Sequence, residues 1–325
     1  CEKARGTPRL DLTQVAIILG NGRKNTSARA GSVDLDVSGE PVRDVLGAGA
    51  KPLTIASLWI GQKWSFLEQI VAQSYLNAGH RFILFGDVRP QSLPSEIAFE
   101  HYADVIEPPF PVGDGQYHNN GVFSDLFRLI LIRDFGFCWV DMDAYCVRHF
   151  DFAGGSYVMA PEVGDVPMPY VATGVLHLPR ASPSLDACIS AFYDENPDLP
   201  WQAVSDAERA EKARSDGVPF RIEMAKWATS GPYLLSHYLS LNDELHHAMP
   251  MTYFYGGQRS RRRPFMKVPF QLERIEVQDA YSVHFYGRTR RYLRDEYGGL
   301  PPKGSYLDLL CRRHGVVAEK LALSQ

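Results

Sequence analysis

The chain has 325 residues, of which 45% are hydrophobic and 22% are charged, and its formal net charge is -4. This balance is ordinary for a soluble globular protein and gives no electrostatic reason to expect a nucleic-acid partner. No uninterrupted apolar run is long enough to span a bilayer. Because the first residue is Cys1 rather than Met, the sequence leaves room for a missing natural start that carried a signal peptide or a membrane anchor.

The cysteines are scattered and form no CxxC pair: Cys1, Cys138, Cys146, Cys188 and Cys311. This spacing argues against structural zinc and against a disulfide scaffold. Cys138 stands in an apolar run, and we expect it to pack as a small hydrophobic residue. Reduced thiols fit a cytoplasmic protein, with a secretory lumen as the alternative.

The first half of the chain begins with weak signals and then becomes clear. Residues 14–19 read as a strand, ended by the turn sequence Gly-Asn-Gly at 20–22, which lacks the rest of a dinucleotide-binding fingerprint. Apolar residues at 53–60 predict a buried strand, those at 66–76 have helical spacing, and 81–85 predict a second strand. This succession of strand, helix and strand is typical of a parallel pair.

Two carboxylates follow a third apolar run. Ser124 is predicted to cap the N-terminus of a helix that Gly136 ends, and the wholly apolar residues 137–140 then predict a strand covered on both faces. Asp141 and Asp143 come directly after it. If the strand geometry continues, both side chains point to the same side of the sheet. Carboxylates held so close repel each other unless a proton or a cation lies between them, so we predict a metal site.

The second half of the chain changes in pattern but shows no repeat and no low-complexity linker, so one continuous domain is the simpler interpretation. Strands are expected at 157–160, 171–178, 251–255 and 281–286. Helices are expected at 186–193, 203–213 and 233–241. The last of these is preceded by Thr-Ser-Gly-Pro at 229–232, where proline suits a first helical turn.

The aspartate pair has a chemical and a plain interpretation. Magnesium and manganese prefer oxygen ligands and usually keep positions for water or phosphate oxygens. Asp141 and Asp143 would then hold a cation that bridges a diphosphate and neutralises its charge as it leaves. The alternative is that Asp-Met-Asp is only a polar turn after a strand, because the motif is so short.

The residues around this pair resemble a known family. The motifs are Ser124-Asp-Leu-Phe-Arg128, Phe135-Gly136, Trp139-Val-Asp-Met-Asp143, and, earlier in the chain, Leu58-Trp-Ile-Gly61, Leu67-Glu68 and Gly79-His80. They are similar to those of the DXD-containing sugar-transferase family, which includes fungal initiating mannosyltransferases, α-1,4-galactosyltransferases and bacterial capsule or lipopolysaccharide transferases. The clostridial glucosylating toxins share the same core pattern. The resemblance runs from about residue 55 to 155 and implies a GT-A type fold and retaining transfer from a nucleotide sugar.

The resemblance implies roles for the matching residues. Asp125 and Arg128, which share a helix face, would contact the donor sugar and ribose, and the alternative is a surface ion pair of small energy. Asp141 and Asp143 would be the donor and metal carboxylates, with Asp143 the direct ligand. Trp59 would stack on the nucleobase, and the alternative is an ordinary interior tryptophan.

Three features of the second half are weaker matches. The family tends to carry a late histidine that completes the metal site, which would be His284, although a histidine on an apolar strand can equally be a core residue. The tryptophan that usually follows it is replaced here by Arg-Thr-Arg at 288–290. Thr-Ser-Gly-Pro at 229–232 resembles a glycine-proline turn near the family's active site. The basic run 259–263 has three interpretations: a solvated loop, a segment that closes over the diphosphate, or a contact for an anionic lipid or polysaccharide acceptor.

The strand and helix pattern predicts an α/β fold, and the resemblance implies that it is a GT-A type nucleotide-sugar-binding fold, with a mixed, mostly parallel central sheet flanked by helices. We expect a single domain with a donor half at 53–152, an acceptor half at 153–325 and an N-terminal extension at 1–50. The expected activity is metal-dependent, retaining transfer of a hexose, with Mn²⁺ or Mg²⁺, from a UDP- or GDP-sugar to a glycan, glycolipid or polysaccharide acceptor. No protein nucleophile is assigned.

The expected biological setting is polysaccharide biosynthesis in the cytoplasm, with peripheral membrane contact; the Golgi lumen is the alternative if an anchor has been removed. Two other functions stay open. A haloacid-dehalogenase-like phosphatase would use Asp141 as its nucleophile, and a non-catalytic relative would only bind a sugar nucleotide or a glycan.

Overall fold

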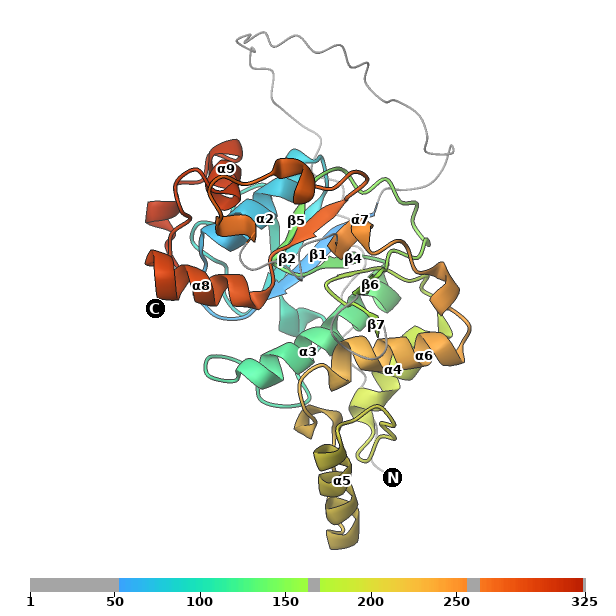
Figure 1. Ribbon diagram of the computed structural model, residues 1–325. Coiled ribbons are helices and arrows are strands. Elements are labelled where there is room, and N and C mark those ends of the chain that lie inside the picture. Colours follow the sequence, from blue (N-terminus) through green and yellow to red (C-terminus); the bar gives the residue numbers. More distant parts are fainter. Residues whose placement is uncertain (1–52, 163–169, 256–263, 324–325) are drawn as a thin grey trace. The chain divides into compact units, whose positions relative to one another are not determined.

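Figure 1 shows the computed structural model, which describes residues 53–162, 170–255 and 264–323. The chain divides into two units, Cys1–Ala50 and Lys51–Gln325, and all described residues belong to the second. The strand expected at 14–19 and the basic run at 259–263 lie outside the described residues. In the part of the chain that is described, no helix has both the length and the apolar character needed to cross a membrane.

Strands and helices are interspersed along the described chain, and the strands of its second half are short. The strands are β1 Ile55–Trp59, β2 Phe82–Gly86, β3 Ala98–His101, β4 Cys138–Val140, β5 Ala144–Cys146, β6 Pro161–Glu162, β7 Tyr170–Val171, β8 Val175–Leu176 and β9 Ser282–His284. The α-helices are α2 Phe66–Asn77, α3 Tyr117–Ile130, α4 Pro183–Tyr193, α5 Val204–Asp216, α6 Leu234–Leu241, α7 Thr252–Tyr255, α8 Gly287–Tyr297 and α9 Tyr306–Arg313.

The central sheet has five strands in the order β3-β2-β1-β4-β8. The first four are parallel to one another, and β8 joins β4 in the antiparallel sense. Two small antiparallel pairs, β5 with β9 and β6 with β7, stand apart from it. The expected mixed α/β fold with a mostly parallel central sheet flanked by helices is therefore confirmed (Figure 1).

Alternate residues of the central strands build two hydrophobic cores, one on each face of the sheet. Ile55 packs into the core that contains α2 and α9, whereas its neighbour Ala56 packs into the core that contains α3, α4 and α6. Because successive strand side chains point to opposite faces, the strands need apolar residues at every position, as β2 shows by being buried throughout. The sheet is thus fixed from both sides, and its strand ends have little freedom.

Helix α2 begins with a reciprocal cap that also reaches the C-terminal part of the chain. Ser65 accepts a hydrogen bond from the Leu67 backbone, and the Ser65 backbone donates to Oε2 of Glu68 at 2.7 Å. The other carboxylate oxygen of Glu68, which is fully buried, forms an ion pair with Arg290 of α8. The cap therefore ties α8 to the N-terminal strand–helix–strand unit.

Several local predictions are wrong. Where a strand was expected at 157–160, only an isolated bridge between Val158 and His177 forms. Helix α3 begins at Tyr117, so Ser124 lies in its middle; Gln116, which precedes the helix, makes no side-chain capping bond and leaves no signal in the sequence. The strand expected at 171–178 is two strands, because the chain bends at Gly174. Residues 252–255 form helix α7 rather than a strand, since a short apolar run does not distinguish the two.

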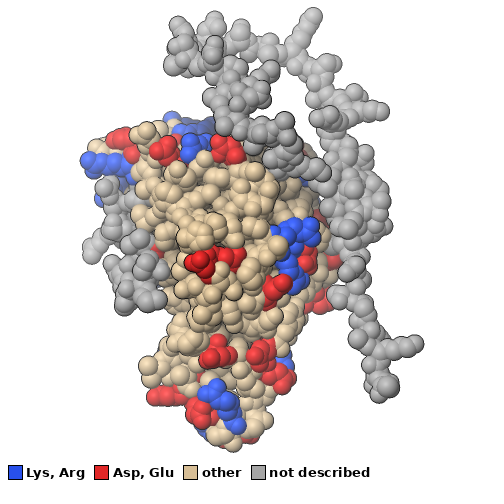
Figure 2. All heavy atoms as spheres, turned by 90° about the vertical axis from the view of Figure 1, so that its right-hand side faces the viewer, with Lys and Arg blue, Asp and Glu red and all other residues tan. Residues whose placement is uncertain are grey.

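The surface of the described residues carries mixed charge. Figure 2 shows acidic and basic side chains close together at the lower end of one face, where α5 lies. On that helix Lys212 pairs with Asp216 at 2.5 Å and Arg214 pairs with Glu211 at 2.6 Å, all four being exposed. Such exposed pairs contribute little to stability.

Candidate active site

The two aspartates lie in a turn that joins two sheets. Strand β4 ends at Val140, and the Ala144 backbone donates to the Asp141 carbonyl at 2.9 Å before β5 begins. The Asp141 backbone itself donates to the Gly174 carbonyl at 2.7 Å. Strand geometry therefore does not continue through the motif as supposed, and the turn, rather than the two-residue period of a strand, brings the carboxylates together.

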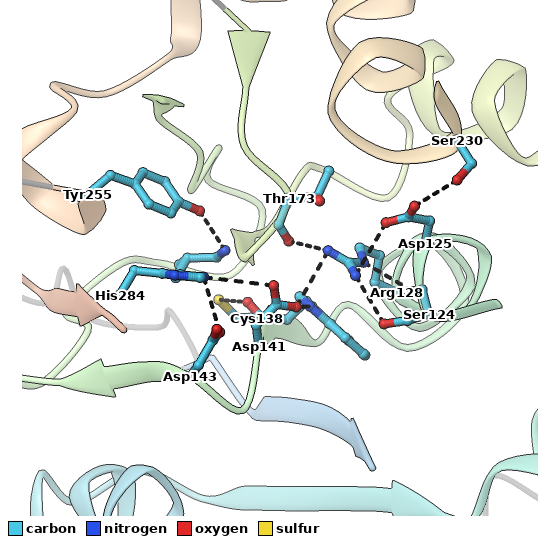
Figure 3. A network of polar contacts seen from close by, with 12 residues as sticks. Ser124, Asp125, Arg128, Cys138, Asp141, Asp143, Thr173, Ser230, Tyr255 and His284 are labelled. Atoms are coloured by element: carbon cyan, nitrogen blue, oxygen red, sulfur yellow. Dashed lines mark hydrogen bonds and ion pairs between the residues drawn. The ribbon is translucent and has the colours of Figure 1, made fainter. Parts of the chain in front are cut away.

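His284 completes the group because of strand register. In the antiparallel β5–β9 pair it lies opposite Ala144, directly after Asp143. Its Nε2 is 3.2 Å from Oδ1 of Asp143 and 3.8 Å from Oδ2 of Asp141. One donor atom from each of the three residues lies within 4.8 Å of the others, and all three residues are half-buried. Among the predicted site residues, the structure thus unites all three proposed metal ligands (Figure 3).

The space beside these donor atoms is kept open by Gly174. A Cβ at this position would lie 2.7 Å from Nε2 of His284 and 3.1 Å from Oδ2 of Asp141. Two carboxylate oxygens and one imidazole nitrogen form a donor set that suits Mn²⁺ or Mg²⁺ and leaves coordination positions for water or phosphate oxygens. The residues present therefore fit a divalent cation.

Arg128 is buried beside the aspartates, and contacts on several sides fix the orientation of its guanidinium. Nη1 donates to the Thr173 carbonyl at 2.7 Å and lies 3.5 Å from Oδ1 of Asp141. Nε donates to the backbone carbonyl of Ser124 and Nη2 donates to its hydroxyl oxygen, both at 3.0 Å. The group also lies 4.8 Å from the centre of the Trp139 ring. A guanidinium fixed on several sides supplies positive charge at one defined place.

Asp125 lies next to Arg128 and faces the π-helical turn Thr229–Tyr233. Its Oδ1 is 3.3 Å from Nη2 of Arg128, and its Oδ2 accepts a hydrogen bond from Ser230 at 2.8 Å. A Cβ at Gly231 would lie only 2.7 Å from this carboxylate. The pair is not the exposed surface pair that was the alternative, because both side chains are largely buried. The predicted glycine-proline turn is thus part of the site.

The charges in this group balance one another. Burial alone would raise the pKa of Asp141, but Arg128 and His284 outweigh it and hold the pKa below its ordinary value. Burial raises the pKa of Asp143, more than His284 lowers it. Burial lowers the pKa of His284, yet the carboxylates of Asp143 and Asp141 raise it to about 9. Without a cation, a proton on His284 therefore offsets part of the negative charge.

Asp125 is also shifted. Burial raises its pKa above the ordinary value, although Arg128 and the hydrogen bond from Ser230 oppose the change. Such a carboxylate is costly to keep ionised without partners, so it favours a ligand that donates hydrogen bonds to it.

These residues line one cavity of about 630 Å³. Its wall includes Asp125, Arg128, Asp141, Asp143 and His284, together with residues that had no predicted role: Glu162, Tyr170, Tyr255, Tyr286, His118 and Trp227. The volume is in the usual range for a small-molecule or cofactor site.

Trp59 lies at the end of β1 but is not among the residues that line this cavity. Its ring packs edge-on against Trp64, with centres 5.8 Å apart, and the Arg290 guanidinium lies over the Trp59 ring, 5.4 Å from its centre. Its role in stacking a nucleobase stays a prediction.

Some contributors to the site were not among the predicted site residues. The Thr173 carbonyl and the Trp139 indole, which donates to Oδ1 of Asp141 at 2.8 Å, act through backbone or packing geometry. Tyr255, whose hydroxyl accepts from the Val175 backbone at 2.8 Å, lies in a segment predicted to be a strand. Trp139 belongs to the motif Trp139-Val-Asp-Met-Asp143 and lies on β4, two residues before Asp141, so this contact could have been predicted.

No protein-family model matches the sequence, and a search of curated proteins found no match. Among solved structures, the PaToxG glycosyltransferase is similar, with 15% sequence identity and a TM-score of 0.38 over 59% of this chain and 71% of that chain. At that TM-score the similarity carries no argument, and the function proposed below depends on the site.

Proposed function

We propose that this chain is a metal-dependent glycosyltransferase of the GT-A type that takes a sugar from a nucleotide-diphosphate donor. The observation that carries the proposal is that one cavity contains both a cation-ligand group, Asp141, Asp143 and His284, and the buried Asp125–Arg128 pair beside it. A diphosphate needs positive charge, and a sugar needs hydrogen-bond acceptors; this cavity offers both at neighbouring positions.

The leaving group would lie between the cation ligands and Arg128. A divalent cation held by Asp141, Asp143 and His284 would supply positive charge to the departing diphosphate. Arg128 adds a fixed second charge, because its contacts with Ser124 and Thr173 hold it in place before the donor binds. Preorganised charge of this kind stabilises a transition state without reorganisation.

Asp125 would orient the sugar by accepting hydrogen bonds from its hydroxyls, while Ser230 holds the carboxylate from the opposite side. In the transfer, the bond between the anomeric carbon and the diphosphate oxygen breaks, and the acceptor oxygen forms a bond to that carbon. The hydroxyl proton passes to the departing diphosphate. Attack on the face that the diphosphate leaves retains the anomeric configuration and requires no protein nucleophile. We propose a glycan, glycolipid or polysaccharide as the acceptor.

The rival phosphatase mechanism needs a free carboxylate at Asp141. Here Oδ1 of Asp141 accepts from Trp139 at 2.8 Å and lies near Arg128, while Oδ2 faces His284. These contacts suit a ligand more than a nucleophile.

The test is a panel of UDP- and GDP-sugars incubated with Mn²⁺ and no acceptor, with release of nucleotide diphosphate as the readout. We expect slow hydrolysis of one donor, lost on chelation and in D143A but retained in D186A, a control at an exposed aspartate. Hydrolysis that persists in D143A would refute the metal assignment. A phosphoaspartate trapped at Asp141 would instead support the phosphatase. The anomeric configuration of the first-formed product, followed by NMR, tests retention.

A further inference from the structure

Two residues of the cavity wall, Trp227 and His118, are not used by the donor site described above. Trp227 is 81% exposed, although it is the largest kind of apolar side chain and would gain stability from burial. An exposed aromatic ring that lines a cavity next to polar groups is typical of a binding surface.

The backbone on both sides of Trp227 is fixed. The buried carboxylate of Asp206 accepts from the Lys226 backbone at 2.7 Å, and the Trp201 indole donates to the Thr229 carbonyl at 3.0 Å. Ala228, next to the tryptophan, has a φ of 72°, a conformation that persists only where the surroundings hold it. The exposure of Trp227 is therefore a property of a held segment and not of a loose loop.

His118 is joined to the same segment and has a defined tautomer. Its Nε2 lies 2.9 Å from the Glu223 carbonyl oxygen. Because a carbonyl can only accept, Nε2 carries the hydrogen, and Nδ1 of the neutral ring is then a hydrogen-bond acceptor. This end of the cavity thus offers an apolar ring and an acceptor nitrogen.

The two residues belong to the segments that carry the proposed sugar side of the donor site: His118 is on α3 with Asp125, and Trp227 comes just before the turn Thr229–Tyr233. Figure 3 shows the order from His284 and the aspartates through Arg128 to Asp125 and Ser230. Trp227 precedes Ser230 by three positions in the same segment, and Ser230 contacts Asp125 at 2.8 Å. Trp227 is therefore close in the chain to the Asp125 end of this row, which is the end proposed to hold the sugar.

We propose that Trp227 and His118 form the acceptor subsite and that it takes a pyranose ring. Trp227 stacks on the apolar C–H face of the ring, and His118 accepts a hydrogen bond from one hydroxyl at its edge. A sugar ring has this combination of an apolar face and a polar edge, and it fits a wall built from an indole beside a ring nitrogen. The inference rests on the proposed function, because it places the acceptor relative to the donor sugar.

The test combines binding and kinetics for the wild type, W227A, W227F, H118A and Y117A. Tyr117 is a matched control, because it is also 81% exposed and adjoins His118 but does not line the cavity. The probes are the methyl glycosides of glucose, galactose and mannose, titrated by saturation-transfer NMR and used as acceptors with the donor found above. We expect W227A to raise the Kd and KM for the preferred glycoside by about tenfold, W227F by about threefold or less, and Y117A not at all, since stacking needs an aromatic face. H118A should also raise both constants.

Several results would overturn the subsite. One is a wild type that binds none of the three glycosides, or that binds N-acetyltyrosinamide in their place. Another is a W227A variant whose KM rises for the donor rather than for the acceptor, which would make Trp227 part of the donor site. If the wild type hydrolyses no donor, the proposed function fails, and the glycoside titrations still decide whether Trp227 and His118 bind a sugar.

Discussion

Nε2 of His284 lies 3.2 Å from Oδ1 of Asp143, because β9 pairs with β5 in the register that sets His284 opposite Ala144. If this contact marks a cation site, H284A and D143A should each weaken Mn²⁺ binding by at least about tenfold. Substitution of residues that only support metal ligands already causes a loss of about this size, and loss of a ligand should cost no less. Isothermal titration measures the effect, with D186A as the control at an exposed aspartate. Unchanged Mn²⁺ affinity in both variants, with the fold intact by circular dichroism, would contradict the assignment.

The affinity for the cation should rise with pH. The pKa of His284 is raised to about 9, so at neutral pH the ring holds a proton that the cation must displace from Nε2. One proton released per cation predicts an affinity increase of about tenfold per pH unit from about pH 6 to about pH 8. The slope should flatten in H284N. Equal affinities of the wild type at the two ends of this range would show that no proton leaves the site on binding.

Substitutions at two glycines should distinguish an effect on metal binding from an effect on donor hydrolysis. G174A places a methyl group 2.7 Å from Nε2 of His284 and should reduce Mn²⁺ affinity by about tenfold or more. G231A crowds the Asp125 carboxylate and should reduce donor hydrolysis while Mn²⁺ still binds. G121A is the matched control: Gly121 lines the same cavity, but a Cβ there meets nothing within 4 Å.

In the interior of helix α3, G121A should also stabilise the protein by roughly 0.5–1 kcal/mol, because alanine loses less backbone entropy than glycine. Equal effects of all three substitutions on Mn²⁺ binding would mean that the contacts of Gly174 have no special role.

Glu244 should be a purely structural carboxylate. It is buried and accepts hydrogen bonds from Tyr157 at 2.6 Å, from Ser182 at 2.9 Å and from the Ser184 backbone at 3.2 Å, which fixes the start of α4. E244A leaves these donors without an acceptor and should lower the free energy of unfolding by about 2–3 kcal/mol. Urea denaturation measures the loss, and Mn²⁺ affinity of the folded fraction should not change. A loss of metal binding without a loss of stability would assign Glu244 to the site instead.

His80 should make the fold sensitive to acid. Its Nε2 accepts a hydrogen bond from the Phe150 backbone at 2.8 Å. Burial lowers the pKa of His80 to about 3, and the stacked His149 makes a smaller contribution in the same direction. Between pH 6.5, the ordinary pKa of histidine, and about pH 3, His80 binds a proton in the unfolded chain but not in the folded chain. The free energy of unfolding therefore falls as the pH falls, by at most about 1.4 kcal/mol per pH unit.

The slope of this pH dependence should be smaller in H80N. H246N is the control, since the side chain of His246 is 61% exposed. A wild type whose free energy of unfolding is constant between about pH 6 and about pH 4 would show that His80 takes up no proton on unfolding.

The sequence was informative where the chemistry is local. Asp125 and Arg128 share a helix face by their spacing, and Asp141 and Asp143 follow a recognisable buried strand, so both pairs could be placed before the structure was known. His284 could be named only through a resemblance, because its position depends on the register of two strands far apart in the chain. Periodicity within one segment contains no information about such a register.

Other contributors were out of reach for related reasons. The Thr173 carbonyl is a backbone group that any residue would supply, and its contact with Arg128 arises where the chain bends between β7 and β8. Trp227 stands in a stretch of mixed polar and apolar residues without clear periodicity, where nothing in the sequence distinguishes a binding residue from an ordinary exposed one. Its place in the cavity depends on the packing of Asp206 and Trp201 around its neighbours.

The turn between β4 and β5 has a consequence for synthesis of the protein. Both aspartates leave the ribosome with the first half of the domain, but their third partner is on β9, close to the C-terminal helices. A nascent chain that stops short of His284 would have the two carboxylates without the histidine. Unfinished chains would therefore be unable to bring all three side chains of this group together until synthesis is nearly complete.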